Sequence, residues 1–129
     1  MLDPATDSHP TDSTLGLDIS RPRPAMVVLE VRGEIDTVTA PRVEAALTEV
    51  QSGEDAALVV DLSRVTFLAS SGLVVLIGAA HRAQARGSRI RLVAATRAVR
   101  RPLEITGSDQ LFGMHASLTE ATEAAAATD

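Results

Sequence analysis

The apolar positions of this chain change their spacing several times, and each change predicts a new strand or helix. Leu15, Leu17 and Ile19 alternate with small or polar residues, which is the period of a half-buried strand. Residues 26–32 predict a second, more apolar strand that pairs antiparallel with the first. Between them, residues 21–24 contain two prolines that withhold backbone donors from a sheet, so we expect a turn there.

The next segment has the pattern of an amphipathic helix that begins near Thr39. Thr39 can cap this helix, and Pro41 lies in the first turn, where its missing N–H costs nothing. Apolar residues then recur at spacings of three and four and form one apolar face, which comprises Val43, Ala46, Leu47 and Val50. Ser52 and Gly53 are expected to end the helix.

Residues 57–62 are almost entirely apolar, which is typical of a central parallel strand covered on both faces. This strand is expected to lead into a short loop that carries two adjacent serines, Ser70 and Ser71. An apolar helix is predicted over residues 71–86, and Gly87 ends it.

The C-terminal elements are shorter. Residues 89–93 alternate and indicate a strand nearer the edge of the sheet, and a helix is expected over residues 97–106. Residues 111–114 can add a last strand, and residues 117–120 have the sequence of a capping box that opens an alanine-rich helix. Because strands alternate with helices, the chain predicts an α/β sandwich with a mixed sheet and right-handed crossovers.

The length of 129 residues fits one domain, which needs neither disulfides nor metal to bury a core. We expect this domain over residues 15–129, preceded by a disordered tail over residues 1–14, which is rich in Asp, Thr, Ser and Pro. No secretory signal is visible at the N-terminus, and the longest apolar run is too short to cross a bilayer. A cytoplasmic protein is therefore expected.

Charge and composition exclude several classes of function. The net charge is −5 and aromatic residues make up 2% of the chain, so a general nucleic-acid partner is not expected. The chain has no cysteine, which excludes disulfides and thiolate chemistry. No cluster of His, Asp and Glu has the spacing of metal ligands, and no glycine-rich phosphate loop occurs, so we expect neither metal nor cofactor.

The two serines lie where a helix begins. The backbone N–H groups of a first helical turn lack intrahelical partners, and the helix dipole is positive there. A phosphate on Ser70 or Ser71 would be stabilised at this position, so we interpret the loop as a phosphorylation switch. The alternative stays open that one serine is simply the N-cap, since serine is preferred at that position without any modification.

The predicted helix after the serines has two different sides. Leu73, Leu76, Ile77 and Ala80 are expected to face the sheet, and Ser71, Val75, Gly78 and Arg82 are expected to face solvent. The solvent side forms a smooth, mildly apolar strip, which is either a docking surface or ordinary surface.

A catalytic serine is not expected. The segment Leu68-Ala-Ser-Ser-Gly72 lacks the leading glycine of a nucleophile elbow. His81 lies ten residues beyond Ser71, too far along the helix to act as its base. We therefore do not expect an enzyme.

Three motifs in residues 15–127 resemble the STAS domain, specifically the stand-alone bacterial anti-sigma factor antagonists. The first is Gly33-Glu-Ile-Asp-Thr37, and the second is Asp61-Leu-Ser-x-Val-x-Phe-Leu-x-Ser-Ser-Gly-Leu73. The third is Ala98-Val-Arg-Arg101 followed by Leu103-Glu-Ile-Thr-Gly107. The resemblance implies a STAS-type sandwich with a mixed sheet of four to five strands and about four helices.

The resemblance also implies a partner switch. In that family the unmodified protein binds an anti-sigma factor that is also a serine kinase, and this binding releases a sigma factor to activate transcription. The kinase phosphorylates the first serine of the pair, which maps to Ser70 with Ser71 as the fallback, and a serine phosphatase reverses the modification. The predicted partner-binding residues are Asp36, Thr37, Ala69, Ser70, Ser71, Gly72, Val75, Gly78 and Arg82.

One position departs from the family pattern, because Ala69 stands where an Asp commonly precedes the phosphorylated serine. The change removes a like charge beside any phosphate, and it also removes a possible partner contact. A second function class therefore stays open, in which the STAS domain is a docking subunit of another assembly, such as a lipid-transport or stress-signalling complex.

Overall fold

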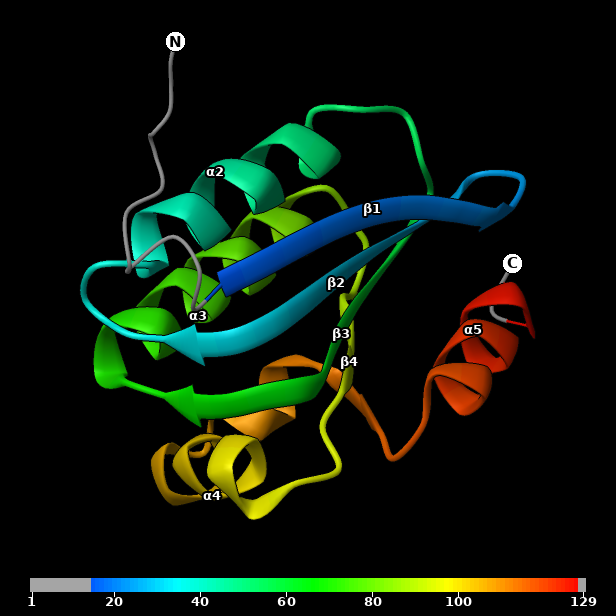
Figure 1. The fold of residues 1–129 in the computed structure, drawn as a ribbon. Coiled ribbons are helices and arrows are strands. Elements are labelled where there is room, and N and C mark those ends of the chain that lie inside the picture. The colour runs from blue at the N-terminus through cyan, green and yellow to red at the C-terminus, as the bar shows by residue number, and fades with distance from the viewer. Residues whose placement is uncertain (1–14, 128–129) are drawn as a thin grey trace, which may run out of the picture.

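The computed structural model describes residues 15–127, which form one mixed sheet with helices on both faces (Figure 1). The sequence-based expectation of a tail over residues 1–14 lies outside these residues. The strands are β1 (Leu15–Arg23), β2 (Met26–Ile35), β3 (Ala57–Leu68), β4 (Arg91–Val93) and β5 (Gly113–His115). The helices are α2 (Ala40–Gln51), α3 (Ser70–Ala85), α4 (Arg97–Thr106), the 3-10 turn η2 (Ser108–Leu111) and α5 (Leu118–Ala127).

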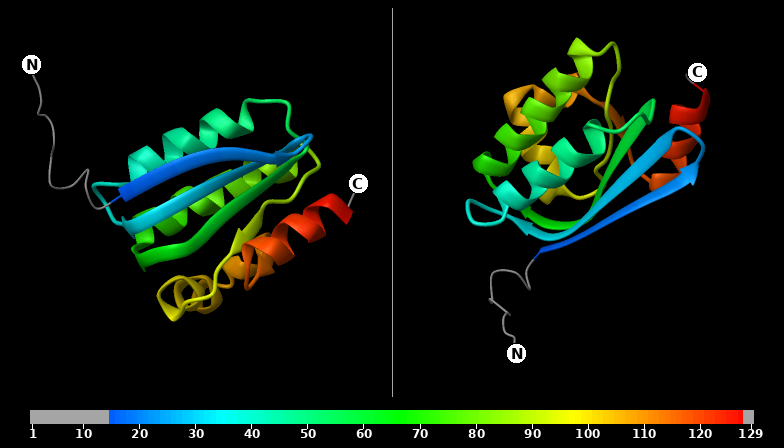
Figure 2. Two further views of the ribbon diagram at one scale, coloured as in Figure 1. Left: turned by 45° about the vertical axis from the view of Figure 1, so that its right-hand side comes forward. Right: turned by 90° about the horizontal axis from the view of Figure 1, so that it is seen from above.

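The strands lie in the order β1-β2-β3-β4-β5, with β1 antiparallel to β2 and every other neighbouring pair parallel. Helices α2, α3 and α4 bury their apolar residues against one face of the sheet, and α5 covers part of the other face (Figure 2). The alternation of β3 shows the two layers, since Val60 and Leu62 enter the main core and Val59 contacts the smaller core under α5. The predicted mixed α/β sandwich is confirmed.

Strand β3 is longer than its apolar run predicts. It continues through Leu68 because it pairs in parallel with β2 as far as Ile35, with irregular register along the way. The sequence does not reveal this extension, because Ser63, Arg64 and Thr66 are polar and exposed and interrupt the apolar run. The expected loop before the serines is therefore only one residue long, Ala69.

The turn expected over residues 21–24 is displaced. Strand β1 runs through Arg23, and the turn comprises Pro24 and Ala25, whose φ of 62° is left-handed. Proline has no backbone N–H to donate. Pro22 is tolerated because β1 is an edge strand, whose outer side has no neighbouring strand to bond with. The register between β1 and β2 shifts here, between Ser20 and Arg23.

The predicted ends of the helices agree with the observed ends to within one or two residues. Strand β4 is shorter than predicted and lies one place inside the edge, because β5 adds parallel to it. One bond of the predicted capping box forms, since the N–H of Glu120 donates to Ser117 Oγ (3.2 Å), whereas the Glu120 carboxylate accepts the N–H of Ala116 (3.4 Å) instead of that of Ser117. None of the helices in residues 15–127 has both the length and the apolar character needed to span a bilayer.

Candidate functional site

The structure brings the first two motifs together at the ends of two adjacent parallel strands. Ile35 and Leu68 are register partners, and the N–H of Ala69 donates to the carbonyl oxygen of Ile35 (2.8 Å). Asp36 and Ser70 are the residues that follow this link on each strand. The acidic motif and the serines therefore share one edge of the sheet.

The Asp36 carboxylate is held by its own loop. Its Oδ1 accepts the N–H groups of Val38 (3.0 Å) and Thr39 (2.9 Å) and lies 3.1 Å from the Thr39 hydroxyl. These bonds lower the pKa of Asp36, and the Thr39 N–H contributes most. The loop from residue 36 to residue 39 therefore holds a negative charge in a fixed orientation at the same sheet edge as Ser70.

Thr39 has a different role from the one predicted. It occupies the N-cap position of α2, but its side chain caps no helical N–H. The buried hydroxyl instead accepts the N–H of Asp36 (2.9 Å) and lies 2.8 Å from the carbonyl oxygen of Glu34. Thr39 thus stabilises the loop that carries Asp36.

The two serines lie inside the first turn of α3, and Ala69 is the N-cap residue in an extended conformation. The alternative that a serine caps the helix is therefore wrong. Ser70 is exposed, whereas Ser71 Oγ is buried and has no hydrogen-bond partner. The first turn contains no acidic residue and no side-chain cap, so its positive end is open to an anion at Ser70.

Gly72 lets the start of α3 approach the strand ends closely. A Cβ at this position would lie 2.5 Å from Ile35 Cγ2 and 2.9 Å from Leu68 Cδ1, both on buried side chains. Any larger residue would push the serines away from Asp36. The glycine of the Ser-Ser-Gly motif therefore sets the distance between the two halves of the site.

The solvent-facing side of α3 differs in phase from the predicted strip. Val75 and Gly78 are half-buried, and Val75 packs against the main core. The exposed valine is Val74, at 68%, which lies one turn beyond Ser70. The sequence analysis missed Val74 because it placed Ser71, and not Ser70, on the solvent side of the helix. Val74 lies four residues after Ser70, and this i, i+4 spacing would have placed both on the same side.

Two further apolar side chains are exposed near the ends of β2 and β3. Val38, in the loop after β2, is 59% exposed, and Phe67, next to the end of β3, is 49% exposed. Neither was predicted as a site residue.

Arg82 takes part in a contact between two helices. Its Nε donates to Gln51 Oε1 (3.0 Å) at the C-terminal end of α2, and Gln51 Nε2 donates to the carbonyl oxygen of Ala79 (2.9 Å). Arg86 also donates to the carbonyl oxygen of Gln51. Arg82 therefore has a structural contact, whether or not it also meets a partner.

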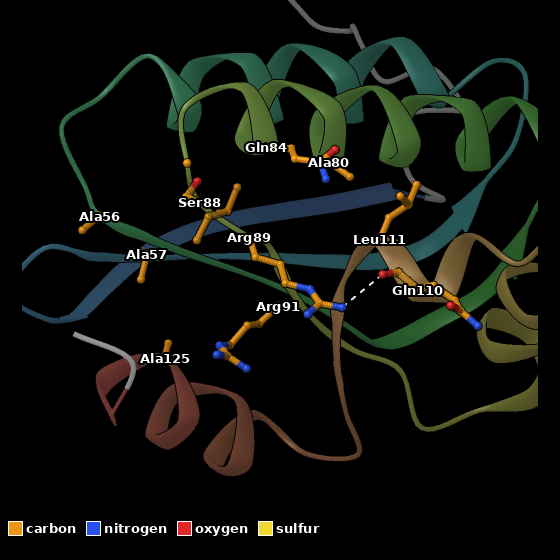
Figure 3. Close-up of a pocket in the computed structure, with 12 residues that line it drawn as sticks. Ala56, Ala57, Ala80, Gln84, Ser88, Arg89, Arg91, Gln110, Leu111 and Ala125 are labelled. Atoms are coloured by element: carbon orange, nitrogen blue, oxygen red, sulfur yellow. Dashed lines mark hydrogen bonds between the residues drawn. The ribbon is translucent and has the colours of Figure 1, made fainter.

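The site around Ser70 contains no constellation for metal binding, since no group of three or more His, Asp or Glu residues in the described part of the chain could hold an ion. A cavity of about 670 Å³ lies at the other end of the sheet, between the start of β3 and the end of α3 (Figure 3). Ser70 itself is exposed at the opposite end of the sheet from this cavity.

Comparison with known proteins gives the family. The model of the STAS domain matches residues 19–121. The chain belongs to the STAS domain family. The anti-sigma-F factor antagonist RsfB of Mycobacterium tuberculosis is 36% identical over 96 residues, which cover 74% of this chain and 78% of that protein. The anti-sigma-B factor antagonist of Listeria monocytogenes is 40% identical over 82 residues, which cover 64% of this chain and 72% of that protein.

Solved structures agree with this assignment. The crystal structure of an anti-sigma factor antagonist from Mycobacterium paratuberculosis matches with a TM-score of 0.81 and 35% identity, over 92% of this chain and 97% of that one. The anti-sigma factor antagonist SpoIIAA in its unphosphorylated form matches with a TM-score of 0.64 and 19% identity, over 81% and 92% of the two chains, which supports the fold alone. The predicted STAS fold is therefore confirmed.

Proposed function

We propose that this STAS protein is an anti-sigma factor antagonist. In its unmodified form it binds an anti-sigma factor with serine-kinase activity, and this binding releases a sigma factor to activate transcription. The observation that carries the proposal is the exposed hydroxyl of Ser70 at the open N-terminal end of α3, beside the ordered Asp36 loop. Two relatives that are at least 36% identical are named for the same role.

Phosphorylation of Ser70 is the proposed control. A phosphate there adds roughly −1.5 to −2 charges at a helix N-terminus, where the dipole and the N–H groups favour an anion. The fold should therefore stay unchanged, and the new charge should act on the interface, where it must be desolvated or meet acidic groups. Ser70 is preferred over Ser71 because Ser71 Oγ is buried.

The proposed docking surface surrounds this serine. It comprises the predicted set Asp36, Thr37, Ala69, Ser70, Ser71, Gly72, Val75, Gly78 and Arg82, with exposed Val74 added from the structure. Ala69 contributes no charge, so Asp36 is the acidic group next to the serines. A serine phosphatase would restore the binding form, and the whole cycle would take place in the cytoplasm.

The test uses the anti-sigma factor captured from the native cell by the unmodified protein. Incubation with this factor and ATP should add one phosphate, seen by intact mass, to the wild type and to Ser71→Ala but not to Ser70→Ala. The phosphorylated protein should lose affinity for the factor in isothermal titration calorimetry. Transfer of phosphate to Ser70→Ala, or undiminished affinity after phosphorylation, would contradict the proposal.

The structural part of the proposal has its own test. A crystal structure of Ser70→Asp should superimpose on the unmodified fold, with strands β2 and β3 and helix α3 in place. A rearranged sheet would show that the modification acts through the fold and not through the interface.

A further inference from the structure

Helix α4, which carries the third family motif, is not part of the site around Ser70. Its residues Val99 and Leu103 are fully buried in the main core, and Gly107 ends the helix in a left-handed conformation. The outer side of the helix, which we call the α4 arginine face, comprises the exposed residues Arg97, Arg100, Arg101, Glu104 and Ile105. Because the buried side of α4 is anchored, these side chains project from a rigid support.

Two arginines of the α4 arginine face have no partner. Within residues 15–127, the side chains of Arg97 and Arg101 make neither a hydrogen bond nor an ion pair. Arg100 pairs with Glu104 (3.4 Å), but both side chains are 51% exposed, so this ion pair is weak and easily exchanged. The face is therefore positively charged, although the net charge of the protein is −5.

A small cavity lies among these side chains. Its volume is about 240 Å³, and it is lined by Ala95, Arg97, Arg100, Arg101 and Glu104. Small-molecule sites usually measure about 300–1,000 Å³, so this cavity has the size for one side chain of a partner protein. A carboxylate suits it, because a guanidinium forms strong, directional bonds to that group.

Ile105 adds an apolar group to the α4 arginine face. It is 68% exposed and lies four residues after Arg101, so the two are neighbours on the helix surface. A ligand that covers both must offer an apolar side chain as well as carboxylates, which a protein surface can do. A nucleic acid is disfavoured, because its phosphates are repelled by the net charge of −5.

The α4 arginine face borders the site of Ser70. Helix α4 packs against β3, beside the half of the strand that ends at Leu68, and β2 lies on the other side of that strand (Figures 1 and 2). Asp36 follows β2, so its negative charge and the positive face flank the strand from which Ser70 follows. Charges of opposite sign at two places on one surface fix the orientation in which a partner docks.

We infer that the α4 arginine face is a second contact for the anti-sigma factor and binds an acidic segment of that factor. The inference rests on the proposed function. Arg97 and Arg101 bind carboxylates of the segment, and Ile105 packs against an apolar side chain within it. Because exposed charges at an interface act chiefly on the association rate, the face steers the factor toward unmodified Ser70.

The test measures the association rate of the captured anti-sigma factor with the full chain by surface plasmon resonance, at low and at high salt. At 0.1 M salt, the double variant Arg97→Gln/Arg101→Gln should associate about tenfold more slowly, because two steering charges are lost. At 1 M salt the Debye length falls to about 3 Å, so the variant and the wild type should associate at similar rates. Ile105→Ser should instead weaken the affinity about three- to tenfold at both salt concentrations, because an apolar contact is lost.

Two controls make the test specific. Arg97→Lys/Arg101→Lys keeps both charges, so it should associate nearly as fast as the wild type. Arg23→Gln removes an exposed arginine without a side-chain partner in the described chain, at the other end of the sheet, and should change the rate by less than about twofold. Since all the replaced side chains are exposed, every variant should keep the thermal unfolding midpoint of the wild type.

Equal association rates of the wild type and the double glutamine variant at 0.1 M salt would overturn the inference. If that variant is still phosphorylated on Ser70 and then releases the factor, the proposed function stands and only the second contact is wrong. Self-association of the wild type that the double variant lacks, seen by analytical ultracentrifugation, would show that a second copy of the chain covers the face instead. If the wild type captures no anti-sigma factor, both proposals fail.

Discussion

Gly72 and Ile35 lie so close that a Cβ on Gly72 would be 2.5 Å from Cγ2 of Ile35, closer than real side chains approach. Ile35 is the last residue of β2 and is fully buried, so it has no room to move. The contact fixes the start of α3 against the strand end from which Asp36 continues.

Replacing Gly72 with alanine should destabilise the protein by about 1–3 kcal/mol, because overpacking exceeds the gain in helix propensity. Gly78→Ala is the matched control on the same helix, since its Cβ would meet only Arg82 NH1 at 3.5 Å. That variant should be more stable by up to about 1 kcal/mol. Urea unfolding of both variants measures the difference, and equal stability would show that Ile35 relaxes.

Removing the Ser71 hydroxyl should leave the protein as stable or more stable, by up to about 1 kcal/mol. Its Oγ is buried without a partner, so the folded state carries a desolvation cost that alanine lacks. Ser70→Ala removes an exposed hydroxyl and should change the free energy of unfolding by less than about 0.5 kcal/mol. A clear loss of stability in Ser71→Ala would reveal a hydrogen bond that the buried hydroxyl makes.

The Asp36 loop should make the protein less stable in acid. Its folded-state pKa lies below the ordinary value of 3.8, chiefly because the Thr39 N–H donates to the carboxylate. The unfolded chain therefore takes up this proton at a higher pH than the folded chain, so the stabilisation is complete above 3.8 and is lost as the pH falls through the folded-state pKa.

Asp36→Asn should remove this part of the pH dependence. Melting temperatures measured between about pH 6 and pH 3 should converge for wild type and variant as the pH falls. Glu34→Gln, which removes a neighbouring exposed carboxylate, controls for the loss of charge alone. A constant difference between Asp36→Asn and wild type across this range would contradict the prediction.

Substitution by arginine should have different effects at Val74 and at Val75. Val74→Arg should lower the affinity for the anti-sigma factor and change the stability by less than about 0.5 kcal/mol, because Val74 is 68% exposed. Val75→Arg should cost about 1–3 kcal/mol of stability, because Val75 packs against the core. Calorimetric titration with thermal unfolding separates the two effects, and full affinity in Val74→Arg would place the docking surface elsewhere.

Much of the site was predictable from short stretches of sequence. The Ser-Ser-Gly segment next to an apolar run placed Ser70 at a helix start, and the family resemblance grouped Asp36 with it among the partner-binding residues. The placement of Ser70 depends on local propensity and on the period of the pattern, which a single segment contains. The same reasoning located helix α4 from Arg97 to Thr106.

Other features depend on neighbours that are distant in the sequence. Pairing with β2 extends β3 to Leu68, and the edge position of β1 admits Pro22 into a strand. The sequence left open, by one residue, which side of α3 faces the sheet. In the structure Gly72 packs against Ile35, and with this orientation Val74 is exposed and Ser71 Oγ is buried.

The sequence by itself therefore determined the order of the elements, the family motifs and the two segments of the site. Only the tertiary structure decided which serine hydroxyl faces solvent and which valine borders it. The physical reason is that periodicity reports which positions can share a face, whereas burial is decided by the elements that pack against that face.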